Sequence, residues 1–194
     1  MKKSAHFNPK SLNWIVSLVI IIILCVGVIF GSKALYDFAN KKYNEPVEVN
    51  FTIASTKDAD ISGTNAENYS VKSLQQAYDD AGNLVAYIVE CETIGYNQES
   101  PIDMTAIISA DGQLVCGIDI LDQKETEYLG VRIAGDDFKK QFDGRYLPVV
   151  ASTSTEKGSK IDVIANSTIS SQAVIDGVNN AQSFVSDNFA KDAE

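Results

Sequence analysis

The chain has very little histidine and no cysteine pattern of the kind that binds metals. Its single histidine, His6, lies near the N-terminus, and its three cysteines (Cys25, Cys91 and Cys116) form no Cys-x-x-Cys motif. This argues against a Ser-His-Asp or Cys-His mechanism, a His-ligated zinc site and thioredoxin-like chemistry. We therefore predict no catalytic residue and no metal ligand. Whether Cys91 pairs with Cys116 stays open, because spacing in the sequence does not establish proximity in space.

Charge is missing from a long stretch near the N-terminus. No charged residue occurs between Ser11 and Ser32, and no acidic residue occurs before Asp37. A run of about 20 apolar residues matches the length of a helix that crosses a hydrocarbon core of about 30 Å. We therefore predict a transmembrane helix over residues 11–35.

The charges before this run predict how the helix is oriented in the membrane. Three lysines precede it, so we expect residues 1–10 to be a cytoplasmic tail and the rest of the chain to lie outside a cell membrane that it crosses once. The small residues Ser32 and Ala34 leave a cleaved signal peptide as an alternative, although the run exceeds the usual apolar region of about 7–15 residues. Without those lysines the net charge of −10 becomes −13 for the external part. So acidic a surface is a poor partner for nucleic acid, and we predict no nucleic-acid partner.

The next part of the chain is polar. Residues 36–70 are predicted to form a stalk or linker, with a helical extension over residues 33–44 that ends before Pro46. Asn50–Asn68 is rich in Ser, Thr, Asp and Asn, which indicates an irregular linker or a mobile edge. We expect a folded domain over residues 71–194.

Two β-hairpins are predicted at the start of this domain. In the first, Leu74–Tyr78 and Leu84–Thr93 flank a five-residue turn. In the second, Ile102–Ser109 and Leu114–Leu121 flank a turn that contains Asp-Gly, a strong hairpin signal.

Helices are predicted in the second half of the domain. Asp136–Phe142 has acidic residues first and lysines later, as a short helix should. Lys160–Ile164 is a predicted strand. Apolar residues recur at three- and four-residue steps over Ser170–Phe189, which is typical of an amphipathic helix. The fold class is therefore α+β, an antiparallel sheet covered by helices.

The segment before the last helix carries the strongest chemical signal. It reads Asp162-Val-Ile-Ala-Asn-Ser-Thr-Ile-Ser-Ser171, and it brings the hydroxyls of Ser167, Thr168, Ser170 and Ser171 to a helix N-terminus. Free backbone N–H groups and the positive end of the helix dipole favour a phosphate there. The alternative is that Thr168 only caps the helix, which is the usual role of such a residue.

This segment resembles the flavin-attachment motif of the FMN-binding domain found in the G subunit of Rnf complexes and in the C subunit of the sodium-pumping NADH:quinone oxidoreductase. The motif in that family reads Asp-x-x-(Ser/Thr)-Gly-Ala-Thr-x-(Ser/Thr)-Ser. The resemblance implies that Thr168 carries FMN through a phosphoester bond, with Asp162, Ser170 and Ser171 at matching positions. Ala165, Asn166 and Ser167 stand where the family has Ser/Thr, Gly and Ala.

A second segment, Glu125-Thr-Glu-Tyr-Leu-Gly130, is similar to the family's Glu-Thr-Pro-Gly-Leu-Gly loop near the flavin. The resemblance implies that Glu125, Thr126, Leu129 and Gly130 lie near the cofactor, and Tyr128 could cover its ring. Taken without the resemblance, the segment would be an ordinary polar loop. Gly95-Tyr96 followed by Pro101-Ile102 also looks like a family stretch.

The resemblance implies a membrane-anchored electron-transfer flavoprotein subunit of an Rnf-type ion-translocating oxidoreductase, not a stand-alone catalyst. Its implied partners are the other membrane subunits, and a flavin transferase is implied for its maturation. Two alternatives remain: a free-standing FMN protein of extracellular electron transfer, and an anchored binding or adhesion domain without a cofactor.

Overall fold

The computed structural model describes residues 27–28, 31–33, 35–37 and 40–189, which divide into compact units of residues 1–41 and 42–194. The described residues up to Asn44 are helical, so the helical extension does end before Pro46 as predicted. The predicted transmembrane helix lies mostly outside the described residues. Within the described ranges, no helix is both long enough and apolar enough to cross a membrane.

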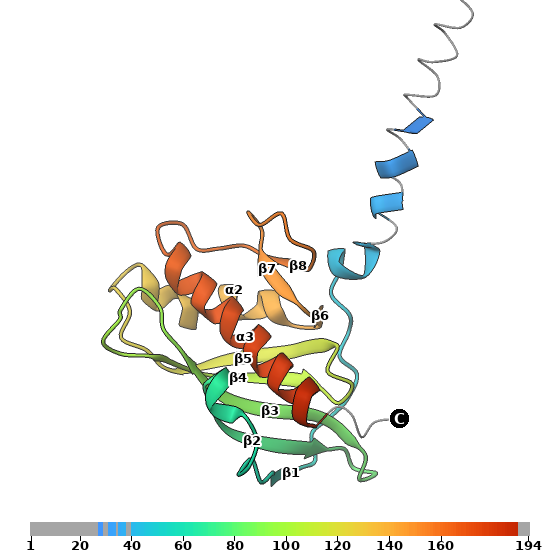
Figure 1. The fold of residues 1–194 in the computed structure, drawn as a ribbon, viewed down its shortest axis with the longest axis vertical. Helices are drawn as coiled ribbons and strands as arrows, with labels where there is room; N and C mark the ends of the chain where they lie inside the picture. The colour runs from blue at the N-terminus through green and yellow to red at the C-terminus, as the bar shows by residue number, and fades with distance from the viewer. Residues whose placement is uncertain (1–26, 29–30, 34, 38–39, 190–194) are drawn as a thin grey trace, which may run out of the picture. The chain divides into compact units, whose positions relative to one another are not determined.

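A six-stranded antiparallel sheet forms the centre of the second unit, with its strands in chain order (Figure 1). Both predicted hairpins are confirmed, because the strands of each pair with one another in antiparallel register. The strands are β1 (Ser55–Asp58), β2 (Val71–Tyr78), β3 (Leu84–Thr93), β4 (Ile102–Ser109), β5 (Leu114–Asp122) and β6 (Arg145–Tyr146).

The segment expected to be an irregular linker or mobile edge contains two regular elements. Ser55–Asp58 pairs with Gln75–Tyr78 of β2 and forms the edge strand β1, although all four of its side chains are exposed. Ala66–Tyr69 forms the 3-10 helix η1. The hydroxyl of Tyr69 donates a hydrogen bond to Asp187 near the end of the last helix. These elements depend on tertiary partners, which a polar sequence pattern does not reveal.

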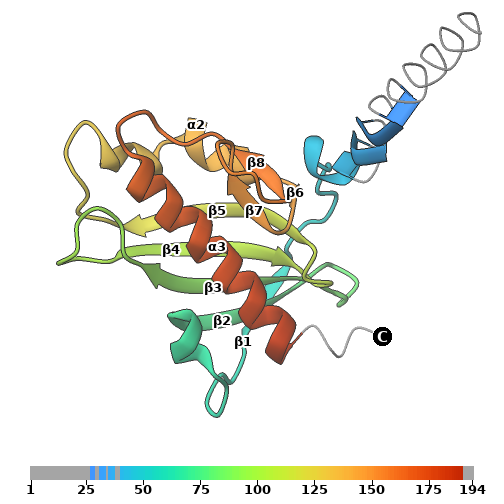
Figure 2. The same ribbon diagram turned by 45° about the horizontal axis from the view of Figure 1, so that its top comes forward.

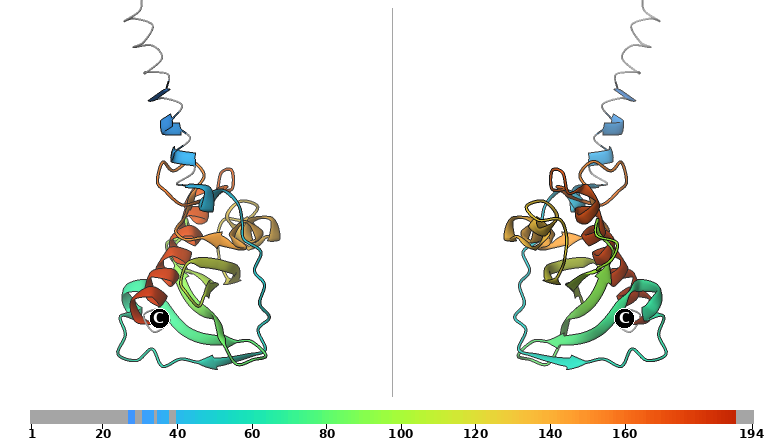
Figure 3. Two further views of the ribbon diagram at one scale, coloured as in Figure 1. Left: turned by 90° about the vertical axis from the view of Figure 1, so that its right-hand side faces the viewer. Right: turned by 90° about the vertical axis from the view of Figure 1, so that its left-hand side faces the viewer.

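One long helix, α3 (Thr168–Asn188), crosses one face of the sheet, as predicted from its periodicity (Figures 1 and 3). Its buried side chains include Val174, Val178 and Phe184, and they pack on the inward residues of β3 and β4. The helix approaches β4 closely at Gly177, where an added Cβ would lie 2.7 Å from Met104 Sδ. The predicted α+β class is confirmed.

Smaller elements follow β5 in the chain. The predicted short helix over Asp136–Phe142 is present as one α-helical turn that continues as a 3-10 helix. The predicted strand at Lys160–Ile164 is shorter than expected and pairs in parallel, outside the main sheet. These elements are η2 (Gly130–Ala134), α2 (Asp136–Lys139), η3 (Lys140–Phe142), β7 (Val149–Ala151) and β8 (Ser159–Ile161).

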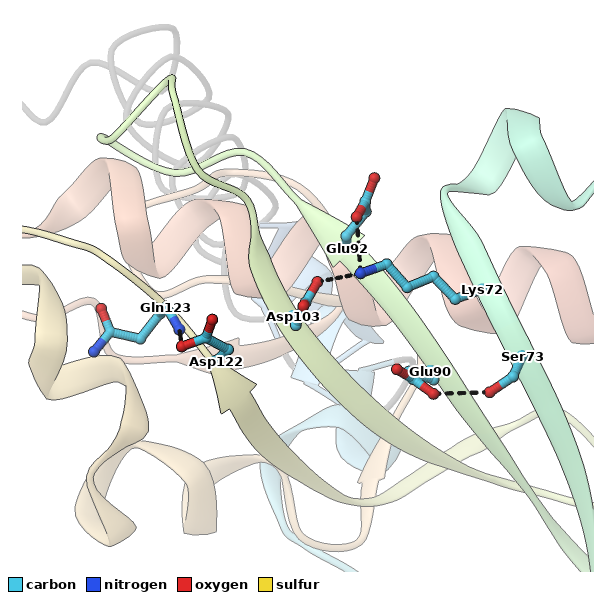
Figure 4. A network of polar contacts seen from close by, with 7 residues as sticks. All are labelled: Lys72, Ser73, Glu90, Glu92, Asp103, Asp122 and Gln123. Carbon is cyan, nitrogen blue, oxygen red and sulfur yellow. Dashed lines mark hydrogen bonds and ion pairs between the residues drawn. The ribbon is translucent and has the colours of Figure 1, made fainter.

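Polar and acidic side chains cluster on part of the sheet face opposite α3 (Figure 4). Glu92 and Asp103 lie directly opposite each other on β3 and β4, a like-charge pair that would repel if it were alone. Lys72 on β2 contacts both, with its Nζ 2.6 Å from Asp103 and 3.0 Å from Glu92. Hydrogen bonds to Asp103 and then Glu92 raise the pKa of Lys72, which therefore stays charged and offsets the repulsion.

The two cysteines of this unit are free thiols. Cys91 is buried beneath α3, where its Sγ lies 3.8 Å from the carbonyl oxygen of Gly177. Cys116 on β5 is only partly buried. Desolvation raises the pKa of Cys91 to about 12 and that of Cys116 to about 11. Both side chains are therefore protonated at neutral pH.

Candidate functional site: a pocket at the start of the long helix

A pocket of about 400 Å³ lies where α3 begins. Its walls come from three segments far apart in the sequence: the β3–β4 loop, the loop after β5 and the start of α3. Figure 2 shows that these segments lie at the same end of the sheet. This volume is within the range of pockets that hold small molecules and cofactors. The lining residues are Tyr96, Thr126, Leu129, Gly130, Asn166, Ser167, Thr168, Ile169 and Ser170.

Thr168 is the first residue of α3, and it is exposed on the pocket wall. The interpretation of Thr168 as a helix cap is wrong, because the capping position belongs to Ser167, which makes no side-chain capping hydrogen bond. The first N–H groups of a helix have no partner within the helix. The positive end of the α3 dipole therefore lies beside the Thr168 hydroxyl, and the Ser167 side chain does not cap it.

Ser167 is buried, with 6% of its surface exposed. Among the described residues, its Oγ is one of two buried side-chain polar atoms without a hydrogen-bond partner. The residue is among those that line the pocket, next to Thr168, but its Oγ has almost no accessible surface. An unpaired buried hydroxyl is destabilising, and the structure gives this one no compensating contact.

Glu125 holds the three pocket segments together. Its carboxylate is buried, with 6% of the residue exposed. Oε2 accepts hydrogen bonds from Ser170 Oγ at 2.6 Å and from the Tyr96 backbone N–H at 3.1 Å, and Oε1 accepts one from the Asn97 N–H at 3.1 Å. Glu125 does not line the pocket. Glu125, which was predicted to contact the cofactor, therefore lies outside the pocket lining and positions its neighbours through these hydrogen bonds.

Glycine is required on both sides of this carboxylate. A Cβ added at Gly130 would lie 2.6 Å from Glu125 Cβ, and one added at Gly95 would overlap the carboxylate and lie 2.8 Å from Ile102 Cδ1. Contacts this short do not occur between real side chains. Both glycines thus allow their loops to close over Glu125, which explains why each occupies its position.

The backbone is left-handed at two positions that are glycine in the family that the chain resembles. Asn166 has φ +65°, and Tyr128 has φ +63°. Asparagine tolerates this conformation, whereas a bulky aromatic residue is strained in it. Asn166 and Tyr128 therefore keep the left-handed backbone that glycine permits, although neither is glycine.

The structure brings only some of the predicted site residues to the pocket. Thr126, Leu129, Gly130, Ser167, Thr168 and Ser170 line it. Tyr128 is 80% exposed and lies in the same loop without lining the pocket. Two residues of the attachment motif, Asp162 and Ser171, lie elsewhere.

Asp162 faces a different pocket of about 550 Å³, beside Arg132 and Gln141. Its backbone groups are hydrogen-bonded to the side chain of Gln141. Ser171 is buried and structural: its Oγ donates to the carbonyl of Ser167 and accepts from the N–H of Ile164. These bonds fix the turn that leads into α3.

Three lining residues, Tyr96, Asn166 and Ile169, were not among the predicted site residues. Tyr96 could have been found, because the Gly95-Tyr96 pair is part of the family resemblance. Asn166 stands in the attachment motif at the position of a family glycine, which is also a usable signal. No sequence feature points to Ile169.

Comparison with known proteins agrees with this geometry. Residues 95–183 match the family described as "FMN-binding domain", and this range includes every residue that lines the pocket. The matched range also includes β4, β5 and most of α3. The chain contains a domain of the FMN-binding domain family.

The chain is also similar to individual named proteins. The chain is 37% identical over 108 residues to the G subunit of the ion-translocating oxidoreductase complex of Methanosarcina acetivorans, covering 56% of this chain and 55% of that one. It is 32% identical over 140 residues to the G subunit of the Na(+)-translocating ferredoxin:NAD(+) oxidoreductase complex of Acetobacterium woodii, covering 69% and 66%. The matches therefore span about half to two thirds of the length of these relatives.

A solved structure shares the fold. The C subunit of the Na(+)-translocating NADH-quinone reductase from Parabacteroides distasonis aligns with a TM-score of 0.53 and 19% identity, over 81% of this chain and 94% of that one. This agrees with the resemblance noted from the two sequence motifs.

Proposed function

We propose that this chain is a membrane-anchored electron-transfer flavoprotein subunit of an Rnf-type ion-translocating oxidoreductase, with FMN linked to Thr168 through a phosphoester bond. The observation that carries the proposal is the hydroxyl of Thr168. It is exposed on a pocket, at the uncapped N-terminus of a 21-residue helix, within a domain of the FMN-binding family.

The pocket suits a mononucleotide phosphate. Free N–H groups and the helix dipole favour an anion at the start of α3, which the side chain of Ser167 does not cap. Leu129, Ile169 and the ring of Tyr96 offer apolar surface on the same pocket, which suits a flat aromatic ring system. The residues present therefore fit FMN at both of its ends.

FMN, when bound, supplies one- and two-electron redox chemistry, and the protein's part is to hold and orient it. In the proposed site Thr168 provides the covalent attachment, while the α3 N-terminus stabilises the phosphate charge. Glu125 keeps the two loops against the helix. Covalent attachment suits a domain outside the membrane, because a tethered cofactor does not diffuse away.

The names of the relatives support the proposed partners, since both are subunits of ion-translocating complexes. We propose that other membrane subunits of such a complex exchange electrons with this chain, and that a flavin transferase loads it. The proposed anchor is the apolar segment over residues 11–35, with the flavin domain on the outer side of the membrane.

Mass spectrometry of the full chain, produced in a host that has a flavin transferase, tests the attachment. We expect an FMN-sized adduct on the peptide that contains Thr168, and its loss in Thr168→Val. Thr126→Val is the matched control, because Thr126 is an exposed threonine on the same pocket and should leave the adduct in place. An unmodified wild-type chain would contradict the proposal and favour a binding domain without cofactor.

Co-purification separates a subunit of a complex from a free-standing flavoprotein. The chain, tagged and extracted from its own membranes in a mild detergent, should bring the other subunits with it in fixed ratio. A flavin-loaded chain that purifies alone would support the free-standing alternative.

A further inference from the structure

Most of the large apolar side chains that are exposed on residues 42–189 gather at the pocket end of the domain. Eight such side chains are exposed, and six of them lie in the segments that build the pocket or in the last two residues of β5. Single exposed apolar residues are normal on a protein surface, whereas a group of them marks an interaction site. The six are Ile94, Tyr96, Leu121, Tyr128, Leu129 and Ile169.

The flavin of the proposed function accounts for only part of this group. Three of the six line the pocket and would face the FMN ring, but Ile94 and Tyr128 do not line it. Ile94 is 50% exposed, and it lines a second hollow of about 350 Å³ together with Thr168 and Ile169. Because both hollows include Thr168 and Ile169, Ile94 borders the cofactor site from outside. We call Ile94, Tyr128 and Ile169 the apolar rim.

Tyr128 occupies its place in the apolar rim against the preference of its backbone. It has φ +63°, a conformation that is strained for a bulky aromatic residue, and its side chain is 80% exposed. Packing within the chain therefore does not explain the ring. Strained backbone is typical of functional sites, and tyrosine is enriched at protein interfaces. Both observations indicate that the ring is used in a contact outside the chain.

The charges around the apolar rim are mostly negative. Residues 94–101, 121–130 and 166–176 expose four acids and one lysine, Lys124. Such a surface repels a second copy of itself and the anionic headgroups of a membrane, whereas it complements a basic surface. The four acids are Glu99, Asp122, Glu127 and Asp176.

We propose that the apolar rim is the docking surface for a partner protein that exchanges electrons with this chain, and that the partner's contact patch is apolar and ringed by basic side chains. This inference deepens the proposed function and rests on it. FMN attached at Thr168 would lie in the pocket that the rim borders, so a partner seated on the rim would meet the cofactor. The small size of the rim suits an electron-transfer encounter, whose interface is typically below about 1,200 Å².

The test is site-specific photo-cross-linking of the full chain in its own membranes. The photoreactive residue p-benzoylphenylalanine replaces Tyr128 in one form and Ile53 in the control. Ile53 is also an exposed apolar residue, and its neighbour Ala54 hydrogen-bonds to Tyr78 at the other end of the sheet. We expect the form altered at Tyr128 to cross-link to one protein, through a peptide that carries lysine or arginine, and to do so less at raised ionic strength. The control should not cross-link to that protein.

Two variants then measure what the ring and the charges contribute to binding of the captured protein. Tyr128→Asn keeps a residue that tolerates left-handed backbone but removes the ring, so it should raise the Kd about tenfold without lowering the free energy of unfolding. Ile53→Asn is its control and should leave the Kd unchanged. Glu127→Gln should weaken the salt dependence of the association rate. Glu67→Gln, which removes an exposed acid on η1, should leave that dependence unchanged.

The outcomes distinguish this inference from the proposed function. A chain that carries FMN but whose Tyr128 position cross-links to lipid, to a second copy, to a peptide without basic residues or to nothing overturns the docking surface and leaves the attachment at Thr168 intact. An unchanged Kd in Tyr128→Asn also overturns it. A wild-type chain that lacks FMN but still cross-links to a basic protein overturns the proposed function, and the apolar rim then remains only a protein-binding surface.

Discussion

Removal of the Glu125 carboxylate should destabilise the pocket end of the domain. This carboxylate is buried and accepts hydrogen bonds from three donors: Tyr96 N–H, Asn97 N–H and Ser170 Oγ. A hydrogen bond to a charged group contributes about 1.5–3 kcal/mol, and contributions from one cluster are not additive. We therefore expect Glu125→Ala to lower the free energy of unfolding by about 3–5 kcal/mol, a large part of the stability of a typical domain.

Glu125→Gln gives a graded version of the same change. The amide keeps the shape and one acceptor oxygen, but its NH₂ group must face at least one of the donors now bound by the carboxylate. The expected loss is about 1–2 kcal/mol, smaller than that of the alanine variant. Glu67→Ala is the charge-matched control, because Glu67 is an exposed acid on η1 and its removal should cost less than about 0.5 kcal/mol.

Urea denaturation gives the free energies, and hydrogen exchange shows where the effect arises. In Glu125→Ala, the backbone amides of Tyr96 and Asn97 should exchange faster, while those of β1 and β2 at the edge of the sheet should keep their order of protection. The reasoning would be refuted by an alanine variant with the wild-type urea midpoint and unchanged exchange at Tyr96 and Asn97.

Three further predictions concern strain, packing and thiol reactivity. Tyr128→Gly should raise the free energy of unfolding by about 1 kcal/mol in urea denaturation, because Tyr128 is 80% exposed and held at φ +63°. Gly177→Ala should lower it by about 1–3 kcal/mol, because the new Cβ would lie 2.7 Å from Met104 Sδ. At pH 8, site-resolved alkylation should be about a hundredfold slower at Cys116 than at a free thiol, and slower still at Cys91, because their pKa values are raised to about 11 and about 12 from 9.0.

Each of these three predictions would be contradicted by a specific result. A destabilised Tyr128→Gly would mean that the exposed ring makes contacts worth more than the backbone strain. A Gly177→Ala chain of wild-type stability would mean that Met104 moves aside without cost. Rapid alkylation of Cys91 in the folded chain would contradict its burial beneath α3.

The larger elements of the fold could be predicted because their signals are local. The Asp-Gly turn specifies the β4–β5 hairpin, and the three- and four-residue spacing of apolar residues specifies α3. β1 could not be predicted in the same way, because its four exposed residues gain their strand conformation only from pairing with β2. The parallel pairing of β7 with β8 likewise depends on a connection that no short pattern records.

The candidate site shows the same division between local and long-range information. The place of Thr168 at a helix start follows from the neighbouring sequence. The role of Glu125 does not, because its partners lie 28, 29 and 45 residues away and none is identifiable from the loop itself. Asp162 marks a limit of motif reasoning, because a residue can belong to a motif and still point into another pocket.

The hydrogen bonds of Glu125 join residues that are far apart in the sequence, and this affects the order in which the domain folds. Contacts between distant residues require large loops to close, so they form after local turns and helices. A newly made, unfolded chain therefore presents the Thr168 hydroxyl without the loops that surround it in the finished domain. Under the proposed function, a flavin transferase would therefore meet Thr168 in one of two settings, an extended segment or the wall of the finished pocket.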